Sequence, residues 1–294
     1  MASRFERRPV IDPTRGAKIA LLVPFRDDHA VGRAANWAWL RKFWETELPG
    51  AEIVVGTDGG NPFSKTCSVN AAFRSSREDN DIIVILDADC YIEPSVILSC
   101  ADAIRESIYR WKTPLWFIPY RWLFRLTEEA TANLIASNPT NALRFPTPPL
   151  SDDVGSTFGS GIGHRFGALI QILPREAFVT IGGMPAPFRG WGGEDVSTLR
   201  ILDTLYAIHE TTRNEVLTLW HTALGDVYLR KWAGQDTTGV NNDLSLRYRK
   251  RRRDPLRMKR EVAKWLNNPD YAQHRISPLP PWYSERSGWE DDGT

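Results

Sequence analysis

The sequence predicts an α/β fold in which a mostly parallel sheet is flanked by helices, followed by a helical extension at the C-terminal end. Apolar runs of strand length alternate with segments of helical spacing through the first half of the chain, and this alternation is typical of parallel sheets. The hydrophobic content of 42% and the charged content of 25% are ordinary for a globular protein. With 294 residues, the chain can form one large α/β domain or two small ones.

The first half of the chain contains three predicted strands and three predicted helices. The run at 81–86 is almost wholly apolar and β-branched, which indicates a strand buried on both faces. Apolar residues near helical spacing predict a helix over 95–111. In chain order, the expected strands are 18–24, 52–57 and 81–86, and the expected helices are 30–48, 65–77 and 95–111.

The pattern after residue 111 is mixed. We expect strands at 115–118, 168–173 and 215–220, and helices at 128–137 and 194–208. Residues 138–163 are rich in Pro, Gly, Asn and Ser, which predicts a long surface loop. We therefore expect one domain over 1–240, with halves at 18–111 and 112–240, and a basic helix with an extended tail over 241–294.

Two aspartates, Asp87 and Asp89, directly follow the buried strand at 81–86. Open α/β sheets bind ligands at the carboxyl ends of their strands. Two carboxylates at such an end suit a divalent metal that bridges the phosphates of a nucleotide. The alternative is a strand-to-helix turn in which the aspartates serve only as caps.

A second acidic pair, Glu194 and Asp195, follows a glycine-rich loop that carries Trp191. The glycines let the backbone approach a ligand closely. The indole offers an apolar face on which a sugar ring can stack. The carboxylates can bind hydroxyl groups or act as a base. The alternative here is a tight turn that leads into a capped helix.

Taken in order, these motifs resemble those of GT-A glycosyltransferases, which have a Rossmann-like sheet and use nucleotide sugars. The likeness is greatest to the β-1,4-galactosyltransferases and the polypeptide N-acetylgalactosaminyltransferases, and it covers roughly residues 18–225. The segments that carry it are Val23-Pro24-Phe25-Arg26, Phe63-Ser64-Lys65, Val69-Asn70-Ala71-Ala72-Phe73, Asp87-Ala88-Asp89, Phe166-Gly167-Ala168, Glu176-Ala177-Phe178, Ile181-Gly182-Gly183-Met184-Pro185 and Gly190-Trp191-Gly192-Gly193-Glu194-Asp195.

The resemblance implies a metal site formed by Asp89 and His221, which would hold Mn²⁺ or Mg²⁺. Asp87 is expected to contact the ribose or the sugar rather than the metal. The galactosyltransferases place a methionine ligand three residues before the histidine, where this chain has Thr218. Because threonine is a weak ligand, the resemblance does not fix the identity or the affinity of the metal.

The resemblance also assigns the reaction and the donor site. Asp195 takes the place of the catalytic base, and Glu194 would hydrogen-bond donor or acceptor hydroxyl groups. Since the retaining relatives have asparagine at the position of Asp195, a carboxylate favours inversion. The residues expected to bind the UDP-sugar donor are Pro24, Phe25, Arg26, Asp58, Lys65, Asp87, Gly167, Trp191 and Gly193.

The expected activity is metal-dependent transfer of a hexose, of the Gal, GalNAc or Glc type, from a UDP-sugar to an acceptor hydroxyl. One alternative is a retaining enzyme similar to the N-acetylgalactosaminyltransferases. Another is a catalytically inactive sugar-binding or nucleic-acid-binding protein of the same fold. A nucleotidyltransferase would need a glycine-rich phosphate loop with a lysine after the first strand, and residues 24–28 do not supply one.

Residues 247–264, which begin with Arg247 and end with Lys264, carry ten basic and two acidic residues, whereas the whole chain has a net charge of only +1. This segment is either a solvated helix or a patch for an anionic partner. We favour a protein or glycan acceptor over a nucleic-acid acceptor bound here.

Two further expectations concern the environment of the protein. The cysteines Cys67, Cys90 and Cys100 show no metal-ligand spacing, which favours reduced, buried thiols. No long apolar run follows the basic start or occurs later, so we expect no membrane span. Eukaryotic members of the resembled family usually carry a membrane anchor. Because we expect no such span here, the resemblance implies a cytoplasmic enzyme of a bacterium or of a virus-infected cell.

Overall fold

The computed structural model describes residues 16–27, 32–139, 154–159, 169–190, 192–222 and 238–284, with backbone alone for 154–159. Its central element is a six-stranded sheet with the order β2-β1-β3-β8-β5-β9. The strands are β1 (Ile19–Pro24), β2 (Glu52–Gly56), β3 (Ile82–Leu86), β5 (Phe117–Ile118), β8 (Ile170–Pro174) and β9 (Glu210–Thr211).

The centre of this sheet is apolar on both faces. Every residue of β1, β3 and β8 is buried, as the run of β-branched residues in β3 predicts. β1 pairs in parallel with both β2 and β3, whereas β8 runs antiparallel to β3 and to β5. β5 and β9 are again parallel, so the antiparallel β8 in the middle of the sheet is the departure from the expected mostly parallel arrangement.

A second, four-stranded sheet has the order β4-β10-β6-β7. It contains β4 (Cys90–Tyr91), β6 (Trp122–Leu126), β7 (Val154–Gly159) and β10 (Glu215–Thr218). The expectation of a loop throughout 138–163 is wrong at 154–159, because the backbone of β7 pairs antiparallel with β6. Glycine and serine in this strand hide its β character, and only pairing with the distant β6 defines it. β6 itself was not expected from the sequence.

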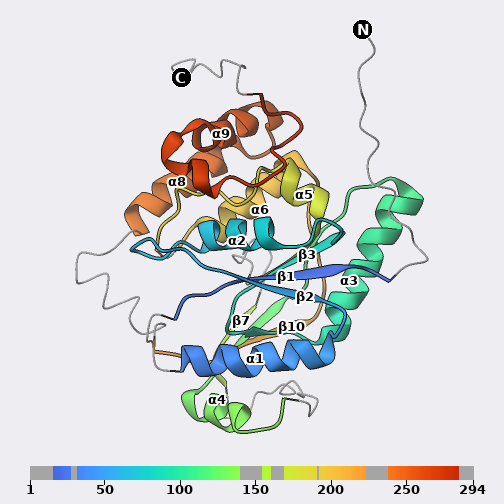
Figure 1. Cartoon of the computed structure of the whole chain (residues 1–294), viewed down its shortest axis with the longest axis vertical. Coiled ribbons are helices and arrows are strands. Elements are labelled where there is room, and N and C mark those ends of the chain that lie inside the picture. The colour runs from blue at the N-terminus through green and yellow to red at the C-terminus, as the bar shows by residue number, and fades with distance from the viewer. Residues whose placement is uncertain are drawn as a thin grey trace.

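Helices cover both faces of the central sheet (Figure 1). α2 (Lys65–Ser75) packs on β1 and β2, and α1 (Arg33–Glu47) lies on the opposite side with α4 (Glu128–Ile135). The remaining helices are α3 (Pro94–Glu106), which continues into the π-helical turn η1 (Ser107–Trp111), α5 (Arg175–Thr180) and α6 (Glu194–Leu205). None of the helices that the structure describes is long and apolar enough to cross a bilayer.

The C-terminal segment packs against α6 rather than standing apart. It consists of α8 (Thr238–Arg251), α9 (Pro255–Asn267) and the 3₁₀ helix η2 (Pro269–His274). Asp254 caps α9 by accepting a hydrogen bond from the Arg257 amide, and Pro255 occupies the first turn. Met258, Val262 and Leu266 on α9 join the main core. The basic segment is therefore two helices, of which α9 has a buried apolar face.

Candidate active site

The aspartates of the first acidic motif lie where β3 ends. The amide of Asp87 donates to the carbonyl of Leu169 at 3.1 Å, which continues the pairing of β3 with β8. The chain then forms β4, whose residue Cys90 pairs with Thr218 of β10. Both aspartate side chains are largely buried, with 20% and 18% of their surface exposed. As predicted, the carboxylates stand at the carboxyl end of a buried strand.

His221 is brought to Asp89 by three hydrogen bonds of the preceding backbone. The amide of Leu219 donates to the carbonyl of Asp89 at 2.8 Å. The amide of Trp220 donates to the Thr131 hydroxyl, and its carbonyl accepts from the buried Asn36 amide. As a result, Nε2 of His221 lies 3.3 Å from Oδ2 of Asp89. The motif spacing alone did not reveal Asn36 or Thr131.

Lys65 joins the two acidic motifs. Its Nζ lies 2.7 Å from Oδ1 of Asp87 and 2.8 Å from Oδ1 of Asp195. Lys65 is the first residue of α2, and Ser64 caps that helix by accepting a hydrogen bond from the Cys67 amide. The cap fixes the direction in which the lysine leaves the helix. Three elements thus meet at one ammonium group, because Asp87 follows β3 and Asp195 opens α6.

The charges in this cluster change the protonation of its members. Burial raises the pKa of Asp195 to about 8, with further increases from Glu194 and Asp87, while Lys65 acts in the opposite direction. Burial also raises the pKa of Glu194. For Lys65, burial opposes the charged form, but Asp195, Asp87 and Glu194 together raise its pKa well above the ordinary value. The lysine therefore stays charged among three carboxyl groups.

The glycine-rich loop is fixed at both of its described ends. The amide of Gly190 donates to the carbonyl of Phe63 at 2.8 Å. Gly193, at φ 87°, precedes α6 in the left-handed region, and a Cβ there would lie 3.0 Å from the carbonyl oxygen of Asn241. Only glycine satisfies both conditions. The first turn of α6 then presents Glu194 and Asp195, where the helix dipole favours negative charge.

Beyond the carboxyl end of β1, aromatic and basic side chains are gathered. Pro24 pairs in register with Gly56, and the amide of Phe25 donates to the Gly56 carbonyl. The guanidinium of Arg26 lies over the Phe63 ring at 5.1 Å and donates to the carbonyl of Gly60 at 2.6 Å. The exposed sides of such rings and guanidinium groups suit a flat nucleobase.

Asp58, which follows β2, is buried beneath this region. Its Oδ2 accepts hydrogen bonds from the amides of Gly60 and Ser64 at 3.1 and 3.2 Å and from Nη1 of Arg189 at 2.8 Å. The carboxylate therefore organises the loop after β2 and pairs with the residue before the glycine-rich loop. The role of Asp58 in uracil recognition stays a prediction. Arg189 was missed, because nothing in its local sequence distinguishes it from a surface arginine.

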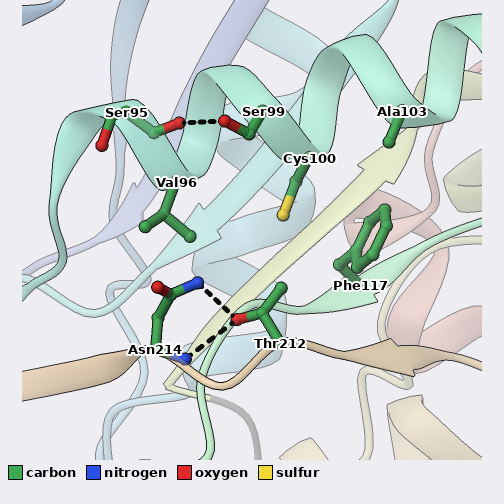
Figure 2. A pocket seen from close by; sticks show the side chains of 8 residues that line it. All are labelled: Ser95, Val96, Ser99, Cys100, Ala103, Phe117, Thr212 and Asn214. Carbon is green, nitrogen blue, oxygen red and sulfur yellow. Dashed lines mark hydrogen bonds between the residues drawn. The ribbon is translucent and has the colours of Figure 1, made fainter.

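Two predicted donor-binding residues, Gly167 and Trp191, lie outside the residues that the structure describes. A cavity of about 380 Å³ lies elsewhere, between α3 and the chain around β5 and β9 (Figure 2). Its wall includes Ser99 and Cys100 of α3 and contains none of the predicted site residues. The carboxylate cluster, and not this cavity, is the candidate active site.

The donor set at Asp89 and His221 fits a divalent cation. An imidazole nitrogen and a carboxylate oxygen face each other 3.3 Å apart, and both side chains are largely buried. A mixed oxygen and nitrogen set of this kind is compatible with Mn²⁺. Thr218, in the place of the family's methionine, ends β10 with a buried hydroxyl that lacks a hydrogen-bond partner among the described residues.

Residues 160–208 match a family model described as the N-terminal domain of galactosyltransferase. The matched segment contains β8, α5, the glycine-rich loop and α6. It confirms, for this part of the chain, the resemblance that the motifs indicate. No curated protein sequence matches the chain.

Three solved structures illustrate the wider comparison. The catalytic domain of Drosophila β1,4-galactosyltransferase 7 in complex with xylobiose shares 19% identity, with a TM-score of 0.35 over 67% of this chain and 64% of that one. A mutant of the same enzyme in complex with manganese, UDP-Gal and xylobiose shares 18% identity, with a TM-score of 0.33 and the same coverage. The 4-diphosphocytidyl-2C-methyl-D-erythritol synthase of Anaerococcus prevotii shares 8% identity, with a TM-score of 0.35 over 68% of this chain and 88% of that one. The chain thus spans about 64% of the Drosophila catalytic domain.

Proposed function

We propose that the protein is a metal-dependent glycosyltransferase that moves a hexose from a UDP-sugar to an acceptor hydroxyl with inversion. The observation that carries this proposal is the cluster at Lys65, where the two acidic motifs meet within 2.8 Å of one ammonium group. In such a transfer the acceptor attacks one side of the anomeric carbon as the diphosphate leaves the other, so the motif that binds the donor and the motif that carries the base must lie close together. The family match over residues 160–208 supports the same assignment.

In the proposed reaction, Asp195 accepts the proton of the acceptor hydroxyl as that oxygen attacks the anomeric carbon. Glu194 holds sugar hydroxyl groups beside it, and Lys65 favours the ionised form of Asp195. Arg26 and Phe25 hold the uridine. Asp89 and His221 would hold Mn²⁺ or Mg²⁺, which would offset the negative charge on the departing diphosphate.

The donor and acceptor are proposed from chemistry and from relatives. The manganese and UDP-Gal in one Drosophila structure support a UDP-hexose donor, and the xylobiose there supports a glycan acceptor. We favour a glycan or protein acceptor over a nucleic acid. A retaining mechanism is the second candidate for the stereochemistry, but Asp195 stands where the retaining relatives carry asparagine.

A panel of UDP-sugars tested for metal-dependent hydrolysis checks this function without any knowledge of the acceptor. We expect one UDP-hexose to be hydrolysed in the presence of Mn²⁺, and the Asp89→Ala variant to lose the metal dependence. The matched control is Asp102→Ala, an exposed aspartate on α3. If UDP bound equally well with and without metal in calorimetry, the metal site would be refuted. The anomeric configuration of the product separates inversion from retention.

A further inference from the structure

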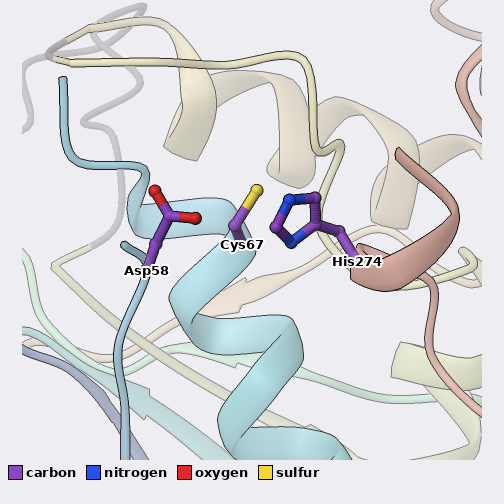
Figure 3. Close-up of side chains that lie close together, drawn as sticks. All are labelled: Asp58, Cys67 and His274. Carbon is purple, nitrogen blue, oxygen red and sulfur yellow. The ribbon is translucent and has the colours of Figure 1, made fainter. Parts of the chain in front are cut away.

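A second group of potential metal ligands lies outside the carboxylate cluster. A carboxylate, a thiol and an imidazole, from Asp58, Cys67 and His274, have ligand atoms within 4.8 Å of one another. They come from three separate segments, namely the loop after β2, the first turn of α2 and the end of η2 (Figure 3). Their separation in sequence explains why cysteine spacing gave no sign of them.

Hydrogen bonds hold the carboxylate of Asp58 in one orientation. The described hydrogen bonds of the Asp58 side chain all fall on Oδ2, which accepts from two backbone amides and from Arg189. Oδ1 belongs to the same rigidly held group and accepts none of these bonds. Metal-binding carboxylates are typically fixed in this way by partners on the oxygen that does not bind the metal.

The thiol and the imidazole complete the set. Cys67 is 1% exposed, and its Sγ makes a weak contact at 3.6 Å with the carbonyl of Ala186, with the hydroxyl groups of Ser64 and Thr66 also beside it. His274 is half-buried, and its Nε2 lies 3.2 Å from Nε2 of the exposed Gln273, which also donates to the carbonyl of Asp270. These contacts do not fix the thiol or the imidazole in place, so both groups can shift toward a bound ion.

We propose that Asp58, Cys67 and His274 bind a zinc ion. Thiolate, imidazole and carboxylate together are the ligands that Zn²⁺ prefers, with water in the fourth position. Zinc–ligand bonds of about 2.0–2.3 Å place tetrahedral ligand atoms roughly 3.5 Å apart, so ligand atoms that lie within 4.8 Å of one another need to approach by at most about 1.3 Å.

The charges at this site balance when the thiol ionises. Zinc binding releases the proton of Cys67 to solvent, so that one thiolate and one carboxylate face the ion. The guanidinium of Arg189 remains on the other oxygen of Asp58, 2.8 Å away. The ion would then fasten the C-terminal η2 to the nucleotide-binding half. It would also stiffen the ion pair that holds Arg189, the residue before the glycine-rich loop.

Metal content of the full chain tests this site. After incubation with Zn²⁺ and dialysis, we expect the wild type to hold one equivalent of zinc more than Cys67→Ser by mass spectrometry, because a cation at Asp89 and His221 would be common to both proteins. Reconstitution with Co²⁺ should give a thiolate-to-cobalt charge-transfer band. Cys67→Ser should abolish the band. His274→Gln should weaken cobalt binding by at least about 10-fold, because loss of even a residue that only supports a metal ligand typically lowers metal affinity by that factor. Cys100→Ser, which replaces a buried cysteine on α3 outside both groups of potential metal ligands, is the matched control and should keep the band.

Two results would overturn the proposal. One is that the wild-type chain retains no more zinc than Cys67→Ser, and the other is that the cobalt band survives in Cys67→Ser or disappears in Cys100→Ser. Because Cys67 is buried and its variant can lose stability, His274→Gln provides an independent arm. Zinc should raise the thermal midpoint of the wild type but not of His274→Gln. Equal midpoint shifts in the two proteins would contradict the site.

Discussion

At the residue scale, Lys65 places one positive charge between carboxylates from two motifs that are far apart in the chain. The side chains of Lys65, Asp87 and Asp195 are between 11% and 20% exposed, so solvent screens their charges only weakly. Without the lysine, three carboxyl groups would share a buried site and would resist ionisation. The lysine therefore controls whether Asp195 is available as a base.

We expect Lys65→Met to move the pH dependence of the reaction. A base works only when ionised, so kcat/KM should fall as the pH decreases through about 8, the pKa to which Asp195 is raised. Loss of the adjacent cation should move this limb to higher pH by about 1–3 units. Lys65→Arg, which keeps the charge, is the control. Unchanged pH–rate profiles in Lys65→Met at saturating Mn²⁺ would refute the role of the lysine.

We expect Asp195→Asn to separate binding from chemistry. The asparagine keeps the size of the side chain and an oxygen that can accept from Lys65, so the affinity for UDP and Mn²⁺ should stay within a few-fold. The turnover number should fall by at least ~100-fold, the scale for losing a general base. Asp203→Asn, near the other end of α6, serves as the control. Near-normal turnover in Asp195→Asn would contradict the inverting mechanism.

At the element scale, the glycine-rich loop is held by α8 as much as by α2. The buried side chain of Asn241 donates from Nδ2 to the carbonyl of Arg189 at 2.7 Å, and its Oδ1 accepts from the Arg189 amide at 3.5 Å. Ser64, the cap of α2, donates its hydroxyl to the carbonyl of Phe188. The position of the loop that leads to Glu194 thus depends on a helix from the C-terminal segment.

We expect Asn241→Ala to lower both stability and donor affinity. Because the variant leaves backbone groups of Arg189 without partners, the free energy of unfolding should fall by about 1–3 kcal/mol. Urea unfolding measures this change, and calorimetry measures UDP binding. Asn242→Ala, on the exposed side of the same helix, should change neither quantity by much. Equal effects of the two substitutions would show that α8 does not position the loop.

At the scale of the whole molecule, the periodicity of the sequence predicted where strands and helices lie better than it predicted which strands pair. Apart from the unexpected β4, the strands and helices from β1 to β3, and α3 taken together with η1, begin and end within about three residues of expectation. Buried runs such as β3 and capped helices such as α2 are defined by local chemistry. The antiparallel placement of β8 and the pairing of β7 with β6 depend on contacts between distant segments, which no local pattern encodes.

The residues of the candidate site also fall into two groups, those that the sequence predicted and those that only the structure reveals. Asp89, His221, Lys65, Asp87 and Asp195 were predicted by resemblance, and the structure brings them together. Their roles in catalysis stay predictions. Supporting residues such as Asn36, Arg189 and Asn241 act through hydrogen bonds to backbone or through ion pairs. Such contacts are made by ordinary polar residues and leave no motif, so only the folded structure reveals them.

The two C-terminal helices contain most of the strongly basic segment 247–264, and the arginines of this segment have different roles. Arg251 forms an ion pair at 2.9 Å with Glu261, whose side chain is 4% exposed. Arg249, Lys250 and Arg252 are exposed. We expect Arg251→Gln to destabilise the fold by about 1–3 kcal/mol, because it leaves a buried carboxylate without its main partner. Thermal unfolding compares it with Arg249→Gln, which should have little effect.

Neutralising Arg249, Lys250 and Arg252 together to glutamine therefore tests the surface without disturbing the fold. Donor hydrolysis should be unchanged, because none of the three belongs to the carboxylate cluster. For a glycan or protein acceptor, transfer should also be unchanged and insensitive to salt. An anionic acceptor such as a nucleic acid would release counterions on binding, so its affinity would fall steeply with salt in the wild type and less steeply in the triple variant. Comparing the salt dependence of transfer in the two proteins decides between them, and a steep dependence confined to the wild type would contradict the glycan or protein assignment.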